Sequence, residues 1–263
     1  MNTDEKLKKS KIIAVGNAFI GGGHYAYIAG PCAVESENGL YEIAKAVKAA
    51  GATILRAGAY KPRTSPHGFQ GLGADGLKII VTVAKEVGLP TVSEIVDPRD
   101  VDMFDDIDML QIGAKNMQNF SLLKEVGKLR KPVLLKRGFC NTLEELLSAA
   151  EYILGEGNEN VVLCERGIRT FENANRFTLD LGGAARLKGI TDLPVIIDPS
   201  HASGRSELVV PLALAAAAVG ADGIEVETHN DPKRALCDGA QAVLPARFAE
   251  IVEKTEKIRK AIL

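Results

Sequence analysis

The sequence predicts a (β/α)8 barrel, the TIM-barrel architecture, with an N-terminal β-hairpin. Short β-branched runs alternate with longer amphipathic or alanine-rich runs along the chain, which is typical of an α/β fold. The alternation yields eight strand-then-helix units, and the length of 263 residues is close to the roughly 250 that such a barrel uses. The turn at Gly30-Pro31-Cys32 lacks the GxGxxG sequence of a doubly wound sheet, the competing fold.

Each expected strand is a short run of apolar residues followed by a helical pattern. The expected strands span residues 26–29, 53–56, 91–95, 109–112, 133–136, 161–164, 195–197 and 223–226. The expected helices span residues 39–50, 76–87, 98–104, 121–129, 143–154, 176–187, 207–219 and 245–262. We find no linker composition or internal repeat between these units, so residues 26–263 are expected to form one barrel domain.

The first 25 residues are expected to form a separate extension. Two apolar runs, residues 12–15 and 18–20, flank Gly16-Asn17, a pair that suits a two-residue hairpin turn. The expected hairpin lies ahead of the first barrel strand and is placed to close one end of the barrel.

Composition excludes several classes of protein. A net charge of −2, no tryptophan and 5% aromatic residues argue against a nucleic-acid-binding surface. The longest uncharged stretch, residues 208–221, is shorter than the roughly 18 residues that span a bilayer. The lysine-rich N-terminus has no apolar signal core behind it, so we expect a cytoplasmic protein without membrane contact. The four cysteines form no CxxC pair, which argues against a disulfide scaffold or a zinc finger.

Basic side chains follow four of the expected strands, the second, fourth, fifth and sixth. In a barrel of this kind the chemistry lies at the C-terminal strand ends, where these residues would meet. Any one of them can be an ordinary solvated side chain, but six basic residues at equivalent positions are not expected by chance. A small ligand with phosphate and carboxylate groups would suit them. The set comprises Arg56, Lys61, Arg63, Lys115, Lys136 and Arg166.

A second group, from strands that become neighbours when the barrel closes, offers metal-ligand atoms. Its members are Cys32, His201, Glu227 and Asp238. One thiolate, one imidazole and two carboxylates suit a divalent ion such as Mn, Fe, Co or Zn. The simpler alternative makes the cysteine a buried apolar residue and the histidine a hydrogen-bonded loop residue. Of the other cysteines, Cys164 is expected in the hydrophobic core and Cys140 in a turn, and the sequence does not assign a role to Cys237. His229 is the other histidine that we consider as a metal ligand in place of His201.

Several segments, in order along nearly the whole chain, resemble the short-chain class of 3-deoxy-D-arabino-heptulosonate 7-phosphate (DAHP) synthases. The segments are 28–35 (IAGPCAVE), 55–64 (LRAGAYKPRT), 111–119 (QIGAKNMQN), 134–138 (LLKRG), 164–167 (CERG), 197–204 (IDPSHASG) and 223–227 (GIEVE). The resemblance implies a metal-dependent, aldol-like condensation of phosphoenolpyruvate with erythrose 4-phosphate that releases phosphate, the first step of the shikimate pathway to aromatic amino acids.

The resemblance also implies roles for individual residues. The family's metal ligands fall on Cys32, His201, Glu227 and Asp238. Its phosphoenolpyruvate contacts fall on Arg56, Lys61, Lys115, Lys136 and Arg166, and the phosphate of the aldose falls to Arg63 and Thr64. The candidate catalytic residues are Lys61, which would protonate the new alkoxide, Glu94, which would place the attacking water, and Asp238 at the metal.

Two alternatives remain at this point. The related 3-deoxy-manno-octulosonate 8-phosphate synthases use arabinose 5-phosphate. Their sequences resemble Lys-Ala-Asn-Arg-Ser where this chain has the shorter segment 61–64. Cys32 further favours a metal-dependent enzyme, because metal-independent octulosonate enzymes carry asparagine at the matching position. A barrel that only binds a phosphorylated metabolite would keep the cations but has no need of four metal ligands.

The family resemblance also suggests an assembly. We expect a homo-oligomer, a tetramer by family analogy, and a separate regulatory partner is possible. With about 25 residues ahead of the first barrel strand, we expect no inhibition by phenylalanine or tyrosine.

Overall fold

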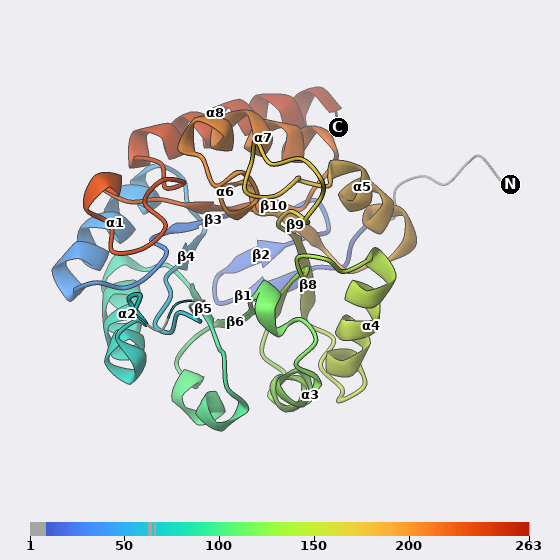
Figure 1. Ribbon diagram of the computed structural model, residues 1–263, viewed down its shortest axis with the longest axis horizontal. Coiled ribbons are helices and arrows are strands. Elements are labelled where there is room, and N and C mark those ends of the chain that lie inside the picture. Colours follow the sequence, from blue (N-terminus) through green and yellow to red (C-terminus); the bar gives the residue numbers. More distant parts are fainter. Residues whose placement is uncertain (1–8, 63–64, 66, 263) are drawn as a thin grey trace, which may run out of the picture.

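Eight parallel strands close into a barrel with helices around it (Figure 1). The computed structural model describes residues 9–62, 65 and 67–262. The ring runs β10-β3-β4-β5-β6-β7-β8-β9, and β9 pairs with β10 to complete it. The barrel strands are β3 (Ala26–Gly30), β4 (Ile54–Arg56), β5 (Thr91–Glu94), β6 (Met109–Ile112), β7 (Val133–Lys136), β8 (Val161–Glu165), β9 (Val195–Ile197) and β10 (Gly223–Glu227). The predicted fold is confirmed, with each strand within one residue of its expected bounds.

The helices pack outside the ring and bury their apolar faces against it. The α-helices are α1 (Glu37–Ala49), α2 (Gly73–Val87), α3 (Phe120–Lys128), α4 (Leu143–Leu154), α5 (Leu181–Ile190), α6 (Pro199–Ser203), α7 (Ser206–Ala218) and α8 (Pro245–Ile262). The 3-10 helices are η1 (Pro98–Phe104), η2 (Ala114–Asn116) and η3 (Pro232–Arg234). No helix in the described ranges is long and apolar enough to cross a membrane.

Two expected helices differ from the structure in position or type, and the other six begin and end within three residues of their expected bounds. The helix expected at 176–187 begins only at Leu181, because the Asp180 carboxylate accepts a hydrogen bond from Gly183 N and caps the helix there. The segment before it instead forms a loop that Ile168 and Thr178 close with a β-bridge. The helix expected at 98–104 has the tighter 3-10 geometry.

Inside the barrel, the side chains change from apolar to polar along five of the strands. Leu134 and Lys136 are two residues apart on β7, so both point inward, the first at the N-terminal end and the second at the C-terminal end. The same step occurs in the pairs Ile54 and Arg56, Val92 and Glu94, Met109 and Gln111, and Ile196 and Asp198. The interior is therefore a hydrophobic core at one end and a polar site at the other.

The N-terminal hairpin closes the apolar end of the barrel. Strands β1 (Ile13–Val15) and β2 (Ala18–Ile20) are antiparallel, with Ile13 opposite Ile20, and Figure 1 shows them across the centre of the ring. Their inward side chains form one buried cluster with the apolar interior of the barrel. Gly16 turns the hairpin with a φ of +54°, and a Cβ there would lie 2.8 Å from Pro90 Cβ. The predicted hairpin is confirmed.

We expect the two faces of the hairpin to respond differently to truncation. Ile20→Ala should destabilise the protein by about 2–5 kcal/mol, because Ile20 is fully buried and the change opens a cavity. Phe19→Ala, on the outward face, should cost under about 1 kcal/mol, since Phe19 is 45% exposed. Denaturant unfolding of both variants measures this difference, and equal losses would contradict the role of the hairpin as a plug.

Candidate active site

The polar end of the barrel holds a hollow of about 150 Å³. All the described members of the basic set predicted from the sequence line it, together with Glu94, His201 and Asp238. These basic members are Arg56, Lys61, Lys115, Lys136 and Arg166. Arg63 and Thr64 lie outside the described residues.

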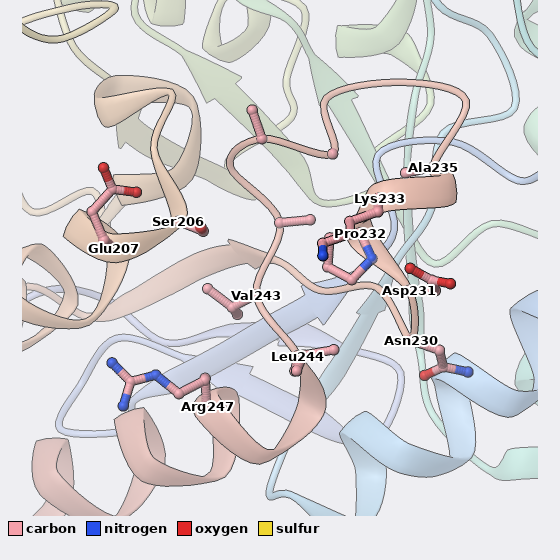
Figure 2. A pocket seen from close by; sticks show the side chains of 13 residues that line it. Ser206, Glu207, Asn230, Asp231, Pro232, Lys233, Ala235, Val243, Leu244 and Arg247 are labelled. Atoms are coloured by element: carbon pink, nitrogen blue, oxygen red, sulfur yellow. The ribbon is translucent and has the colours of Figure 1, made fainter.

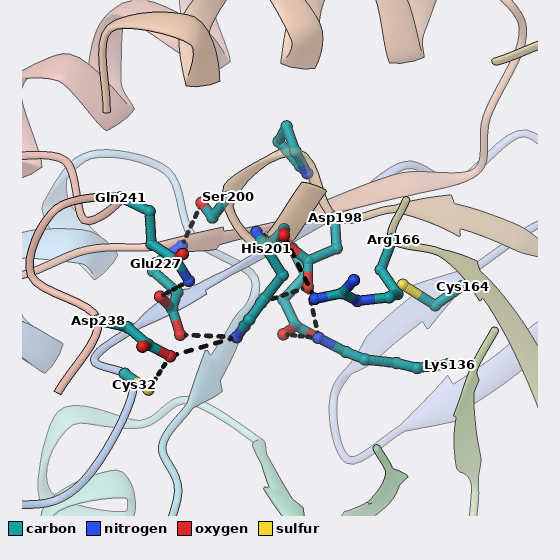
Figure 3. Close-up of polar contacts among 12 residues, drawn as sticks. Cys32, Lys136, Cys164, Arg166, Asp198, Ser200, His201, Glu227, Asp238 and Gln241 are labelled. Atoms are coloured by element: carbon teal, nitrogen blue, oxygen red, sulfur yellow. Dashed lines mark hydrogen bonds and ion pairs between the residues drawn. The ribbon is translucent and has the colours of Figure 1, made fainter. Parts of the chain in front are cut away.

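The four predicted metal-ligand side chains come together at the edge of this hollow (Figure 3). One potential ligand atom from each of Cys32, His201, Glu227 and Asp238 lies within 4.8 Å of those of the other three. His201 Nε2 is 3.1 Å from Glu227 Oε1 and 4.0 Å from Asp238 Oδ2. The Cys32 thiol donates to Asp238 Oδ2 at 3.2 Å. Soft and hard donors at this spacing suit a divalent metal ion.

Local structure fixes the direction of the His201 ring. Asp198 directly follows β9 and caps α6, where its Oδ1 accepts a hydrogen bond from His201 N at 2.9 Å. Its Oδ2 lies 2.6 Å from His201 Nδ1, which leaves Nε2 pointing at the other ligand atoms. A carboxylate behind a ligating imidazole is a recurrent feature of metal sites, because it sets the tautomer and orientation of the ring.

Asp238 reaches the cluster from a strained loop. Its φ of +52° lies in the left-handed region, which few non-glycine residues adopt and aspartate adopts more often than most.

Two further buried carboxylates near the ligand cluster, those of Asp198 and Glu225, are both paired with one lysine. Lys136 Nζ donates to Asp198 Oδ2 at 2.5 Å and to Glu225 Oε1 at 2.6 Å, and all three side chains are buried. These two carboxylates and His201 are close enough to suggest another metal site. The lysine ammonium supplies the positive charge there instead.

Arg56 is likewise paired with acid. Its Nη1 donates to Glu227 Oε1 at 2.7 Å, and its Nε lies 3.6 Å from Glu225 Oε1. Acidic partners within the protein therefore offset the charges of Arg56 and Lys136 before any ligand binds. The opposing acids, which lie two residues apart on β10, point into the same barrel interior.

Arg166 is held by aromatic rings. Its guanidinium carbon lies 5.0 Å from the centroid of Phe139 and 4.3 Å from that of Phe177. Its guanidinium donates to the backbone carbonyls of Gly167 and His201, and it forms no ion pair with a described residue. Burial lowers the pKa of Arg166, and an arginine in this environment favours an anion that arrives as a ligand.

Lys61 and Glu94 both reach the hollow and are buried. The pKa of Lys61 is raised although burial opposes this, because Cys32, Glu94 and Glu227 lie near it. Glu94 packs over Gly113, where an added Cβ would lie 1.9 Å from Glu94 Oε1. Lys115 is exposed at the rim and donates to the carbonyl of Pro62 at 2.5 Å.

The pKa values of the two protonated ligands are shifted upward. Burial disfavours the charged imidazole, yet Asp198 and Glu227 raise the pKa of His201 to about 10. The pKa of the Cys32 thiol is raised well above its usual value by its hydrogen bond with Cys237, burial and nearby Glu227. Both groups therefore carry a proton at neutral pH when no metal is bound.

We expect metal binding to release about two protons at pH 7, because thiolate and neutral imidazole are the ligating forms. His201 is protonated below a pH of about 10, so raising the pH removes the competing proton and metal affinity should increase. Calorimetric titration with Mn²⁺ in two buffers of different ionisation enthalpy counts the protons. An affinity that stays constant between pH 6 and pH 8 would contradict this picture.

The other cysteines and His229, which the sequence also offered as candidates, lie outside the group of four ligand side chains. Cys164 is buried inside the barrel, Cys140 is exposed, and Cys237 lies in a small cluster with Cys32 and Ala33. His229 lies 3.9 Å from Glu35, apart from the ligand cluster. Sequence reasoning missed Arg176 and Phe139 in the hollow lining. Both lie in loops after strands, and the position of Arg176 was hidden by the helix expected over 176–187.

A larger hollow of about 910 Å³ lies elsewhere, against the loop between β10 and α8 (Figure 2). Val243, Leu244, Lys233, Glu207 and Arg247 are among the residues that line it. Figure 2 shows its charged side chains spread around the rim and not directed at one point. Size alone therefore does not identify the site, whereas convergent charges and metal-ligand atoms favour the smaller hollow.

Comparison with known proteins finds a matching family model and similar enzymes of two kinds. The family model described as "DAHP synthetase I family" matches residues 4–262. The chain is 48% identical over 252 residues to the phospho-2-dehydro-3-deoxyheptonate aldolase of Thermotoga maritima, covering 95% of this chain and 75% of that protein. It is 33% identical over 270 residues to the 2-dehydro-3-deoxyphosphooctonate aldolase of Syntrophotalea carbinolica, covering 95% of both.

Solved structures agree. The crystal structure of the Thermotoga maritima DAHP synthase superposes with a TM-score of 0.93 at 47% identity, covering 97% of this chain and 75% of that one. A truncated form of the Thermotoga maritima enzyme superposes with a TM-score of 0.90 at 44% identity, covering 97% and 94%.

Proposed function

The chain belongs to the DAHP synthetase I family, and we propose on that basis that it condenses phosphoenolpyruvate with erythrose 4-phosphate and water to give DAHP and phosphate. The observation that carries this proposal is the group of four metal-ligand side chains at the edge of a cation-lined hollow. A protein that only binds a phosphorylated metabolite would need the hollow but not the ligand group. The octulosonate aldolase relative is less similar than the heptonate aldolase, at 33% against 48% identity.

Phosphoenolpyruvate fits the cationic hollow by its charge. It carries a carboxylate and a phosphate on three carbons, so its two anionic groups need cations on two sides. We propose that Arg56, Lys61, Lys136 and Arg166 hold it, with Lys115 at the rim. Arg166 supplies a full positive charge there, since it has no acidic partner among the described residues.

The four ligand side chains fit a divalent metal such as Mn, Fe, Co or Zn. Cys32, His201, Glu227 and Asp238 offer one sulfur, one nitrogen and two carboxylate donors, and Asp198 orients the imidazole. When bound, such an ion acts as a Lewis acid that polarises the aldehyde of the second substrate.

We propose that Lys61 and Glu94 handle the protons. The enol carbon of phosphoenolpyruvate forms a bond to the aldehyde carbon, and Lys61 donates a proton to the resulting alkoxide oxygen. Glu94 orients the water that adds to the cationic carbon and accepts its proton. The hemiketal hydroxyl then gives its proton to the departing phosphate as its carbon–oxygen double bond forms, the carbon–oxygen bond to phosphate breaks, and inorganic phosphate leaves. Both side chains line the hollow, as these steps require.

The choice of aldose is tested directly. Phosphate release from phosphoenolpyruvate is measured with erythrose 4-phosphate, with arabinose 5-phosphate and with neither, each with and without Mn²⁺. We expect release with erythrose 4-phosphate and metal only. Preference for arabinose 5-phosphate would favour the octulosonate reaction, and no release with either aldose would favour a binding protein. Segment 61–64, where we propose Arg63 and Thr64 as the aldose phosphate site, carries this specificity.

Lys61→Met should lower kcat by about 100-fold or more, since positioned proton transfer contributes about 10²–10⁴. Its effect on Mn²⁺ affinity should be small because Lys61 supplies no ligand atom. Steady-state kinetics and Mn²⁺ titration measure the two effects. A variant that keeps near-normal turnover removes Lys61 from the mechanism.

We also propose a homo-oligomer. Light scattering measures its mass in solution.

A further inference from the structure

One buried amide connects the candidate metal ligands to the mouth of the hollow. Gln241 is 2% exposed. Its Nε2 donates to Glu227 Oε2 at 2.5 Å, and its Oε1 accepts from Arg176 Nη1 at 3.0 Å. Figure 3 shows Gln241 beside Glu227, on the side away from His201. A single side chain therefore joins a candidate metal ligand to a cation of the hollow.

The chemistry of its two partners requires an amide at this position. Arginine only donates hydrogen bonds, and an ionised carboxylate only accepts them. Glu227 acts as an acceptor here, because its Oε2 accepts from Gln241 Nε2 and its Oε1 accepts from Arg56 Nη1. A carboxylate at 241 would have no proton for Glu227, and an ammonium would have no lone pair for Arg176.

Arg176 has the properties of an anion-binding residue. It lines the same hollow as Arg166 and forms no ion pair with any residue that the structure describes. Its guanidinium lies 5.7 Å from the centroid of Phe177, the ring that also stacks on Arg166. Gly204 leaves room for the aliphatic part of the Arg176 side chain, because a Cβ at position 204 would lie 2.7 Å from Arg176 Cβ. The side chain is thus held in place with its charge uncompensated.

We propose that Arg176 joins Arg166 in binding the phosphate of phosphoenolpyruvate, and that Gln241 is a positioning residue that couples Arg176 to Glu227. The identity of this anion rests on the proposed function. A dianionic phosphate can accept hydrogen bonds from two guanidinium groups at once. A metal ion that orders Glu227 would order Gln241 and Arg176 as well. By linkage, bound phosphate would strengthen metal binding by the same factor.

The test compares Arg176→Met, Gln241→Met and the double variant with the unmodified protein. Calorimetry measures the Kd of Mn²⁺ alone and the Kd of phosphoenolpyruvate in the metal-free protein. Arg176→Met should weaken phosphoenolpyruvate binding about tenfold or more and change Mn²⁺ binding by less than about threefold, because Arg176 reaches Glu227 only through Gln241. Gln241→Met should weaken both, with a loss of about 10–100-fold for Mn²⁺.

The double variant separates positioning from independent binding. If Gln241 acts on phosphoenolpyruvate through Arg176, the double variant binds it no more weakly than Arg176→Met alone. Additive losses would overturn the positioning role. Arg176→Met binding phosphoenolpyruvate as tightly as the unmodified protein would overturn the proposal as a whole, and this variant changes an exposed side chain.

A matched control removes another arginine from the same loop. Arg169 is exposed and does not line the hollow, so Arg169→Met should leave both dissociation constants unchanged. An equal loss in this control would mean that net charge alone explains the effect, which overturns the assignment to Arg176. Turnover of the unmodified protein with erythrose 4-phosphate tests the proposed function separately: a protein that binds phosphoenolpyruvate without turnover contradicts that function, while the variant series still decides the coupling.

Discussion

Replacing Cys32 with asparagine is expected to abolish turnover, with a loss of at least about 10³-fold, and to weaken Mn²⁺ binding by more than about 100-fold. Cys32 supplies the only sulfur in the ligand group, and its Sγ lies 3.2 Å from Asp238 Oδ2. A neutral amide cannot replace the charge of a thiolate at a metal ion. Phosphate release and Mn²⁺ calorimetry measure the two losses.

Chelation provides an independent route to the same result. Incubation of the unmodified protein with a chelator should remove activity, and added Mn²⁺ should restore it. Cys140→Ser is the matched control, because Cys140 is exposed and lies outside the ligand group. Full activity in the presence of chelator would contradict metal dependence.

Lys136→Met is expected to destabilise the fold by about 3–5 kcal/mol and to abolish phosphoenolpyruvate binding. The substitution leaves Asp198 and Glu225 without the ammonium that lies 2.5 Å and 2.6 Å from them. Both carboxylates are fully buried, and a buried charge without its partner carries a large desolvation cost. Denaturant unfolding and calorimetry with phosphoenolpyruvate measure the two effects.

A surface lysine and a double variant serve as controls. Lys128 forms an exposed ion pair with Glu125 on α3, so Lys128→Met should change stability by less than about 1 kcal/mol. Adding Glu225→Gln to Lys136→Met should recover part of the lost stability, because it removes one unpaired charge. A loss for Lys136→Met as small as that for Lys128→Met would show that the buried group does not need its lysine.

The barrel strands were predictable because a parallel barrel strand buries both of its faces. Val133–Lys136 begins with a short apolar run and ends where the polar end of the barrel begins, which the sequence alone shows. The helix expected at 176–187 was misplaced because a polar loop with Arg176 and Phe177 has no local signal to distinguish it from a first helical turn. Only the capping contact between Asp180 and Gly183 N shows where the helix begins.

The sequence by itself determined the residue types at the strand ends: the four metal-ligand side chains, the basic set, and the resemblance that the family match confirmed. It could do so because side chains two residues apart on a barrel strand share a face, and the end of each strand is marked by its composition. Only the tertiary structure decided how these charges are paired. Lys136 pairs with Glu225, and Arg56 pairs with Glu227. Gln241 bridges Glu227 and Arg176. All of these contacts except that between Gln241 and Glu227 join segments 65 or more residues apart in the chain. Such pairings depend on distances that closure of the barrel creates, and no local pattern records them.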